Sequence, residues 1–185
     1  MSDEKNPWTI LSSQLQYDNP WIRVTEHQVL NPAGGEGIYG VVHFKNLALG
    51  VVAYEDGWIW MVGQYRFPLE TYSWELPEGG GPLGIDALES AKRELREETG
   101  LEAAHYEPIL EMDLSNSVSD ERAIVYLATG LSQGEAAPEE TEELKVRKMR
   151  LEEVYEMVER REIRDSLTVA AVYKVMLMKA RGELQ

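Results

Sequence analysis

The chain of 185 residues is long enough for one domain with a substantial core and for a small additional unit. Its formal net charge of −15 argues against nucleic-acid binding through a basic surface, so an anionic ligand would need local arginines or divalent cations. The chain has no cysteine, and its first residues do not resemble a secretory signal peptide. It also has no apolar stretch that could span a bilayer, so we expect a cytoplasmic protein without a membrane partner.

The first part of the sequence predicts a small β unit. The segment Trp21–Val29 alternates loosely between apolar and polar residues, and a second strand is expected near Ile38–Phe44. Between them, the Asn-Pro-Ala-Gly-Gly-Glu-Gly run at 31–37 is a strong loop signal. A lone hairpin is not stable in water, so this unit, residues 1–45, must pack on the rest of the chain or on a second chain.

The remainder, residues 46–185, predicts an α/β domain in which helices flank a mixed sheet. Two apolar runs, Leu47–Ala53 and Trp58–Tyr65, are joined by residues that include an Asp-Gly pair, which favours a hairpin turn. A short strand is expected at Ser73–Pro77 and a loop at Gly79–Gly84. The later elements are expected as strands Tyr106–Met112 and Arg122–Ala128, an acidic surface loop Glu135–Glu143, a strand Leu144–Met149, and helices Leu151–Arg160 and Ser166–Lys179.

A helix is expected between Asp86 and Gly100, because Asp86 followed by Glu89 resembles a capping box and glycine is typical of a helix end. At about 100° per residue, three of its carboxylates share an arc about 100° wide. They are Glu94, Glu97 and Glu98, and the apolar residues Leu88, Ala91 and Leu95 border them and can pin the helix to the sheet.

Local physics disfavours this cluster twice. Glu94 and Glu98 are four residues apart, where like charges destabilise a helix by about 0.2–0.5 kcal/mol, and they lie near the C-terminus, where negative charge is unfavourable. A hard divalent cation with oxygen ligands, Mg²⁺ or Mn²⁺, would remove the conflict. The alternative is a solvated acidic face with Arg93 and Arg96 as ion-pair partners, and the spacing alone leaves both open.

The residues from Gly79 to Leu101 resemble the Nudix box. Gly79 is followed, after thirteen residues, by the run Arg-Glu-Leu-Arg-Glu-Glu-Thr-Gly-Leu at 93–101. The pattern departs from the family at Ile85, where a glutamate usually ties the loop to the helix. We expect Ile85 to change the packing of the loop, and Asp86 could take over part of the role of that glutamate.

The resemblance extends to the branch that hydrolyses ADP-ribose and other nucleoside diphosphate sugars. It rests on Gln-Tyr-Arg at 64–66 and on Trp-Glu-Leu-Pro-Glu-Gly-Gly at 74–80, and it covers most of Trp21–Lys179. It implies an α/β/α sandwich with a mixed sheet, a small N-terminal β unit that helps to form a swapped homodimer, and a nucleotide-sugar substrate.

The resemblance also implies roles for individual residues. The metal ligands would be Glu94, Glu97, Glu98 and the backbone carbonyl of Glu78, with Mg²⁺ or Mn²⁺ as the metal and Arg93 orienting the carboxylates. Arg66 would contact the diphosphate or the terminal ribose, Gly79 and Gly80 would let the backbone approach the substrate, and Trp21 and Tyr39 would stack on the base. Ordinary packing on a hairpin is the alternative for the two aromatic residues.

The general base in this branch often comes from a loop after the box. The polar segment Leu114–Glu121 is the candidate here, and we favour Glu121 as general base or third-metal ligand. The alternative is an exposed loop acid. Because related ADP-ribose enzymes often carry proline in this loop, whereas Leu114 and Asn116 occur here, the identity of the sugar stays open.

The sequence leaves three alternative functions open. The first is a Nudix enzyme that acts on nucleoside triphosphates or dinucleoside polyphosphates, and the segments at 64–66 and 75–77 argue against it. The second is a non-catalytic nucleotide-sugar-binding module, for which Ile85 is the hint. The third is a structural subunit with an acidic helix face, which would bind no metal.

Overall fold

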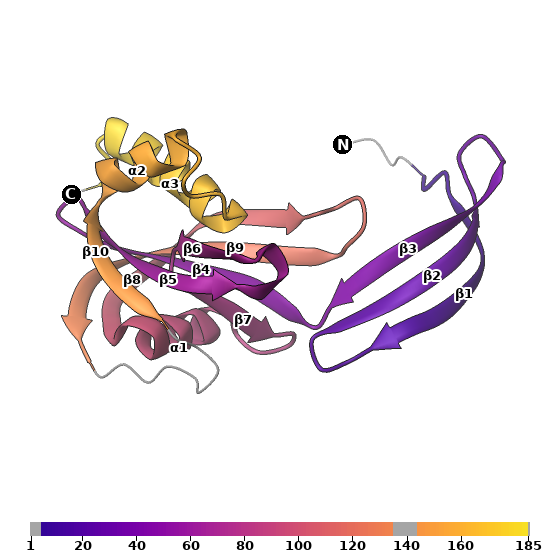
Figure 1. Cartoon of the computed structure of the whole chain (residues 1–185), viewed down its shortest axis with the longest axis horizontal. Coiled ribbons are helices and arrows are strands. Elements are labelled where there is room, and N and C mark those ends of the chain that lie inside the picture. The colour runs from indigo at the N-terminus through magenta and orange to yellow at the C-terminus, as the bar shows by residue number, and fades with distance from the viewer. Residues whose placement is uncertain (1–4, 135–143, 185) are drawn as a thin grey trace. The chain divides into compact units, whose positions relative to one another are not determined.

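The computed structural model describes residues 5–134 and 144–184, which form two compact units (Figure 1). The first unit comprises the chain up to Asn46 together with Asp113–Arg122, and the second comprises Leu47–Met112 and the chain from Ala123 onward. The predicted acidic loop Glu135–Glu143 lies outside the described residues. Among the described helices, none has the length and apolar character that a membrane crossing requires.

The N-terminal unit is an antiparallel sheet of three strands in the order β1-β2-β3. The strands are β1 (Thr9–Asp18), β2 (Ile22–Leu30) and β3 (Glu36–Phe44). The sequence predicted β2 and β3, whereas β1 was not expected. Irregular pairing with β2, between Ile10 and Ser12 and between Leu15 and Tyr17, explains the omission, because a bulge shifts the apolar residues out of simple alternation.

The C-terminal unit contains a seven-stranded mixed sheet. Its central path is β10-β5-β4-β9-β8, with β6 paired to β5 and β7 paired to β4. The pair β4–β9 is parallel, whereas β4–β5, β5–β6 and β5–β10 are antiparallel, which confirms the predicted mixed sheet. The strands are β4 (Asn46–Glu55), β5 (Trp58–Arg66), β6 (Thr71–Glu75), β7 (Glu78–Pro82), β8 (Leu101–Leu114), β9 (Glu121–Gln133) and β10 (Lys145–Arg150).

Helices cover both faces of this sheet. The helix α1 (Ala87–Thr99) lies on one side, and α2 (Leu151–Glu159) and α3 (Ser166–Ala180) lie on the other (Figure 1). A short 3-10 helix, η1 (Phe67–Leu69), joins β5 to β6. The core beneath α1 combines Leu49, Val51 and Ala53 of β4 with Ala91 and Leu95 of the helix. The apolar residues of α1 therefore pin it to the sheet, as predicted.

Of two predictions for glycine-containing segments, one is confirmed and the other is partly wrong. Asp56 and Gly57 both have positive φ, 49° and 82°, so the predicted Asp-Gly hairpin turn between β4 and β5 is confirmed. The predicted loop at Gly79–Gly84 was wrong over its first part, because β7 forms there and pairs with β4. A Cβ at Gly81 would lie 2.6 Å from Leu49 Cδ1, so tight packing on β4 requires glycine within this strand.

Candidate active site

Local signals at both ends fix the helix α1. The carboxylate of Asp86 accepts a hydrogen bond from the Leu88 amide at 2.9 Å and caps the N-terminus. At the other end Gly100, with φ of 72°, donates its amide to the Arg96 carbonyl. Both helix ends predicted from the sequence are confirmed. Ile85 is 59% exposed beside the cap, and Asp86 supplies the polar contact to the helix backbone at this turn.

The three glutamates on α1 do not form a solvated face. Glu98 is 4% exposed, and the side chains of Glu94 and Glu97 are 13% and 25% exposed. Arg93 donates to Glu94 Oε1 at 2.6 Å, to Glu97 Oε2 at 3.0 Å and to the Gly80 carbonyl at 3.1 Å. A helix face that is only solvated would not bury its carboxylates, because burial of a charge is costly. The cluster is therefore built into the fold, with Arg93 holding two of its members.

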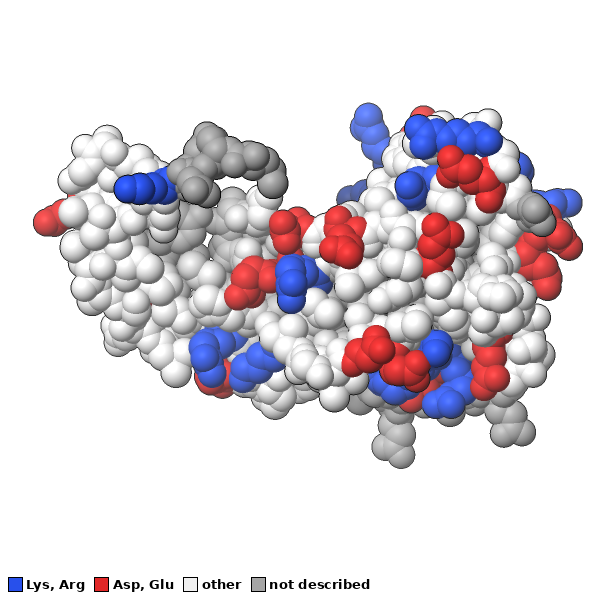
Figure 2. Space-filling model, turned by 180° about the vertical axis from the view of Figure 1, so that it is seen from behind, with Lys and Arg blue, Asp and Glu red and all other residues white. Residues whose placement is uncertain are grey.

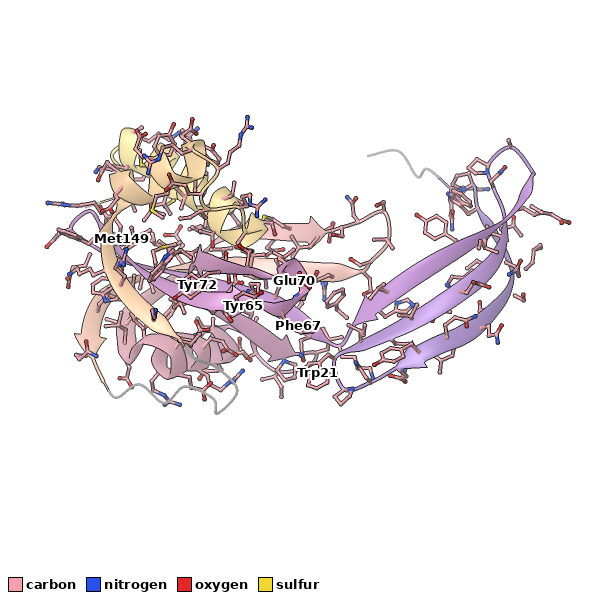
Figure 3. The ribbon with its side chains drawn as sticks, viewed as in Figure 1. Trp21, Tyr65, Phe67, Glu70, Tyr72 and Met149 are labelled. Atoms are coloured by element: carbon pink, nitrogen blue, oxygen red, sulfur yellow. The ribbon has the colours of Figure 1, made fainter. Side chains whose placement is uncertain are left out.

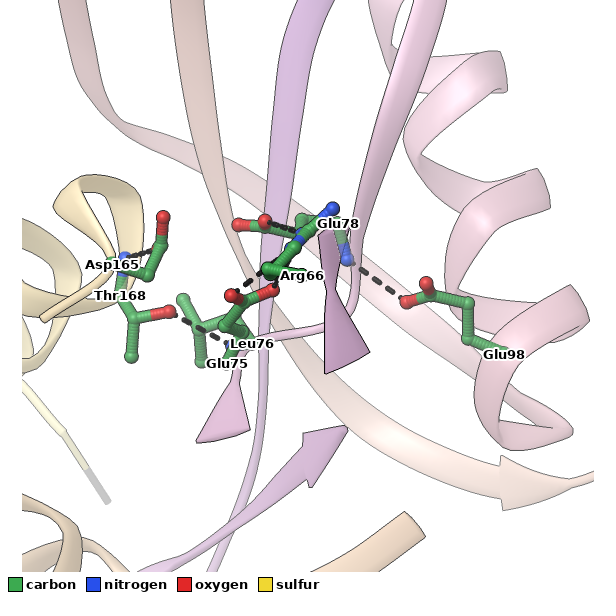
Figure 4. Close-up of polar contacts among 7 residues, drawn as sticks. All are labelled: Arg66, Glu75, Leu76, Glu78, Glu98, Asp165 and Thr168. Atoms are coloured by element: carbon green, nitrogen blue, oxygen red, sulfur yellow. Dashed lines mark hydrogen bonds and ion pairs between the residues drawn. The ribbon is translucent and has the colours of Figure 1, made fainter. Parts of the chain in front are cut away.

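The backbone of β7 comes directly against these carboxylates. The amide of Glu78 donates to Glu98 Oε2 at 2.9 Å (Figure 4). At Gly79, a Cβ would lie 2.3 Å from the carboxylate carbon of Glu94, so only glycine allows this approach. Carboxylate oxygens are hard ligands, the kind that Mg²⁺ and Mn²⁺ prefer. The residues present therefore fit a hard divalent cation.

A second acidic cluster lies on the other side of the same segment. Oxygens of Glu75, Glu78 and Asp165 lie within 4.8 Å of one another, and among the described residues this group has metal-like spacing. However, Arg66 occupies it: its Nε lies 3.1 and 2.9 Å from the two carboxylate oxygens of Glu75, and its Nη2 contacts both Glu75 and Glu78 (Figure 4). This guanidinium already supplies a positive charge to the cluster.

The electrostatics of the second cluster reflect its burial. Burial raises the pKa of the Glu78 carboxyl well above its ordinary value, and the charges of Asp165 and Glu75 act in the same direction. Burial lowers the pKa of Arg66, but its hydrogen bond to Glu75 and the nearby carboxylates outweigh this effect, so that its pKa is raised overall. The second oxygen of Glu78, Oε2, is buried without a hydrogen-bond partner among the described residues. The cluster is thus a tight ion-pair network around Arg66.

The side chains of Glu75, Glu78 and Asp165 were not expected from the sequence to form a group. Glu78 was predicted to bind a metal through its backbone carbonyl, and Glu75 was only part of the segment at 74–80. No local pattern links either side chain to the start of α3. Asp165 could have been recognised from its position just before the predicted helix, because aspartate is a common N-cap residue. In the structure it caps α3 and accepts a hydrogen bond from the Thr168 amide at 2.7 Å.

Comparison with known proteins decides the family. The model of the NUDIX domain matches residues 45–170, which is more than half of the chain. The chain belongs to the NUDIX family. In addition, the model of the nucleoside diphosphate sugar hydrolase N-terminal domain matches residues 8–42, which include most of the three-stranded sheet.

Relatives of this NUDIX protein carry different functional descriptions. An ADP-ribose pyrophosphatase of Mycobacterium tuberculosis is 38% identical over 130 residues, which are 66% of this chain and 60% of that protein. A methanol dehydrogenase activator of Bacillus methanolicus is 37% identical over 93% of this chain and 94% of its own length. A solved ADP compounds hydrolase is 20% identical and superposes with a TM-score of 0.86 over 99% of this chain and all of that chain, which shows that the two share a fold.

The remaining candidate residues of the NUDIX protein lie in the N-terminal unit. The side chain of Asn19 accepts from the amides of Trp21 and Ile22 at 2.9 and 2.7 Å, and this turn presents Trp21 with 66% of its surface exposed. The Tyr39 hydroxyl donates to the Ser117 carbonyl at 2.6 Å, and its ring meets the edge of Trp8 at 5.3 Å. Trp21 is thus open to a ligand, while Tyr39 already holds two partners.

Glu121 belongs to the same unit and begins β9. Burial raises its pKa above the ordinary value. Its loop is anchored on β3, because the Val42 amide donates to the Val118 carbonyl at 2.8 Å. Beside Glu121, the Asp120 carboxylate meets His43 Nδ1 at 2.7 Å and accepts from the Phe44 amide at 3.0 Å. Glu121 therefore directly follows a loop that several hydrogen bonds hold against β3.

Proposed function

We propose that this NUDIX protein is a Mg²⁺-dependent hydrolase that cleaves the diphosphate bond of a nucleoside diphosphate sugar such as ADP-ribose. The products would be a nucleoside monophosphate and a sugar phosphate. The observation that carries the proposal is the approach of the Glu78–Gly79 backbone to the buried carboxylates of Glu94 and Glu98. The match of the N-terminal segment to a nucleoside diphosphate sugar hydrolase domain supports the substrate class.

The chain's own residues divide the work of the reaction. Glu94, Glu97, Glu98 and the carbonyl of Glu78 would hold Mg²⁺, with Mn²⁺ as a possible substitute. The bound ion would neutralise charge on the diphosphate and lower the pKa of water. Arg93 keeps two of these carboxylates in place through its bonds to Glu94 and Glu97.

We assign the proton-accepting role to Glu121, with a further metal ligand as its alternative role. Its raised pKa makes its carboxylate a better proton acceptor at neutral pH than an ordinary glutamate. Glu121→Gln should lower kcat about 100-fold or more while the affinity for Mn²⁺ stays within about twofold of the wild type. A loss of Mn²⁺ binding in this variant would move Glu121 to the metal-ligand role, and an unchanged kcat would remove both roles.

Substrate binding is assigned to Trp21, Tyr39, Arg66, Gly79 and Gly80. The exposed indole of Trp21 is the stronger stacking candidate, because base–aromatic stacking contributes about 1–3 kcal/mol and needs a free ring face. Trp21→Ala should therefore raise KM about tenfold with kcat unchanged. Leu11→Ala, which removes another exposed apolar side chain of the same unit, serves as the control, and an equal rise of KM in both variants would contradict a specific stacking role for Trp21.

We also propose a homodimer, because the N-terminal unit has almost no core of its own. Of its described residues only Val29 is buried, while Ile10, Leu15, Tyr17 and Ile38 are each more than half exposed. Most of this unit's surface in Figure 2 is uncharged. In the C-terminal unit, Tyr65, Phe67 and Tyr72 around the β5–β6 connection are exposed as well (Figure 3). Apolar surface of this extent is typical of a contact with another chain.

Sedimentation velocity tests the dimer. The wild type should sediment as a dimer, and Leu15→Glu combined with Tyr17→Glu should shift it to a monomer, since buried charge opposes association. A wild-type monomer at micromolar concentration would remove the proposal. Cytoplasmic localisation likewise stays a prediction, which cell fractionation would test.

A substrate panel tests the proposed reaction. ADP-ribose, GDP-mannose, ADP-glucose, a nucleoside triphosphate and a dinucleoside polyphosphate would each be incubated with the protein and Mg²⁺. The proposal expects a nucleotide sugar to give the highest kcat/KM and nucleoside monophosphate as a product. A preference for the triphosphate or the polyphosphate would favour a different NUDIX substrate class. Tight nucleotide-sugar binding without turnover in Mg²⁺ or Mn²⁺ would favour a binding module.

A further inference from the structure

The segment Leu76–Glu78, which joins β6 to the backbone beside the box glutamates, is bound from three elements. The Leu76 amide donates to the hydroxyl of Thr168 at 2.9 Å. The Pro77 carbonyl accepts from the Val51 amide of β4 at 2.9 Å, and the Glu78 amide donates to Glu98 of α1 at 2.9 Å. Figure 4 shows Thr168 and Glu98 on opposite sides of this segment.

Thr168 is itself rigidly placed. It is fully buried, and its amide donates to the Asp165 carboxylate that caps α3, at 2.7 Å. A residue in the first turn of a capped helix has little freedom, so its hydroxyl is a fixed acceptor. Leu76 is also fully buried, and therefore its amide has no access to water as a replacement partner. The bond between Thr168 and Leu76 thus links the start of α3 to the peptide two residues before the Glu78 carbonyl.

We propose that Thr168 is a positioning residue for the divalent-metal site. Its hydroxyl fixes Leu76 so that the Glu78 peptide keeps its bond to Glu98 and presents its carbonyl beside the carboxylates of α1. This inference rests on the proposed function, because it takes the Glu78 carbonyl and the box glutamates as metal ligands. It adds that α3, on the opposite face of the sheet, sets the geometry of that site through a single hydroxyl.

The change Thr168→Val tests this role at almost constant volume. Valine keeps the shape of the side chain but leaves the Leu76 amide buried without an acceptor, so the segment must shift or open to water. Thr168→Ser keeps the hydroxyl and should restore the function of the site. Thr168→Ala removes the hydroxyl without adding a methyl group, and it supplies the same comparison with serine if the valine variant does not fold.

The readout is the dissociation constant of Mn²⁺ without substrate, measured on the full chain by electron paramagnetic resonance. We expect Thr168→Val and Thr168→Ala to bind Mn²⁺ about tenfold more weakly, at the lower end of the range for direct partners of metal ligands because Thr168 acts through Leu76, and Thr168→Ser to stay within about threefold of the wild type. Val154→Ala, a buried change in α2, controls for general destabilisation and should leave the Mn²⁺ affinity unchanged. Wild-type affinity in the valine or alanine variant, or equal weakening in Val154→Ala, would overturn the proposal.

Glu98→Gln separates this inference from the function on which it rests. If Glu98→Gln loses Mn²⁺ binding while Thr168→Val keeps it, the metal site stands and the role of Thr168 falls. If Glu98→Gln binds Mn²⁺ like the wild type, the metal assignment falls and the role of Thr168 falls with it. Weakened binding in both variants, with rescue by serine, supports both.

Discussion

Two acidic clusters flank the same stretch of backbone, and each contains three carboxylates and one arginine. In the cluster on α1, Arg93 gives one bond each to Glu94 and Glu97, and the backbone at Gly79 approaches the carboxylates. In the second cluster, the guanidinium of Arg66 forks onto Glu75 and also contacts Glu78. The two clusters have the same number of ionisable groups, but the contacts of their arginines differ.

The clusters differ in how their negative charge is compensated. In the second cluster the guanidinium of Arg66 contacts two carboxylates, and the pKa of the buried Glu78 is strongly raised, so that less negative charge remains to be balanced. In the cluster on α1, the buried carboxylate of Glu98 accepts a hydrogen bond from the Glu78 amide, and Arg93 bonds to Glu94 and Glu97. We therefore propose the metal site on α1 from the way in which the charge of each cluster is compensated, and not from how closely its acids are spaced.

The largest expected effect is the loss of a carboxylate on α1. Glu98→Gln should lower kcat for nucleotide-sugar hydrolysis with Mg²⁺ more than about 100-fold, because changes in outer partners of metal ligands already cost about 10–100-fold. Glu89→Gln, on the exposed first turn of the same helix, is the control and should stay within about twofold of the wild type. Near-normal turnover in Glu98→Gln would place the metal elsewhere.

The next effect concerns the backbone approach. Gly79→Ala should reduce kcat about 10–100-fold, because its Cβ would lie 2.3 Å from the Glu94 carboxylate carbon and would push strand and carboxylate apart. Gly37→Ala is the matched control, since a Cβ there meets no atom within 4 Å. Steady-state kinetics at saturating Mg²⁺ would measure both variants. Equal activity in the two would show that the close approach at Gly79 has no role in catalysis.

A smaller effect is expected on stability, and it should differ between the two arginines. Arg66→Lys should destabilise the fold by about 1–3 kcal/mol, because lysine keeps the charge but loses the forked contact inside a buried network. Arg93→Lys should cost at most about 1 kcal/mol, because Arg93 gives only one bond to each of its two carboxylates, which are less buried than Glu75. Urea unfolding measures both. The opposite order of stability losses would reverse the structural roles given to the two clusters.

The smallest expected effect is a pH dependence of stability. The pKa of Glu78 is higher in the folded chain than in the unfolded chain, so the wild type loses stability as pH rises through this interval. Glutamine does not titrate, so the melting temperature of Glu78→Gln relative to the wild type should increase from pH 5 to pH 9. Calorimetry in EDTA would measure this difference, and a relative decrease would mean that Glu78 is stabilised as a carboxylate.

The parts of the fold that could be predicted from the sequence depend on a few neighbouring residues. The two ends of α1 follow from Asp86 and Gly100, and the β4–β5 turn follows from Asp56 and Gly57. The strand β7 was missed because its glycines look like a loop, and only pairing with β4 makes them a strand. The contact of Thr168 with Leu76 joins two distant segments, so no periodicity or spacing could have revealed it.

The most direct test compares one carboxylate from each cluster in the same titration. Mn²⁺ binding would be measured for the wild type, Glu98→Gln and Asp165→Asn, where asparagine can still cap α3. We predict that Glu98→Gln loses Mn²⁺ binding and that Asp165→Asn keeps the wild-type affinity within about twofold. Loss of binding in Asp165→Asn together with wild-type affinity in Glu98→Gln would contradict it, because the metal would then belong to the cluster around Arg66.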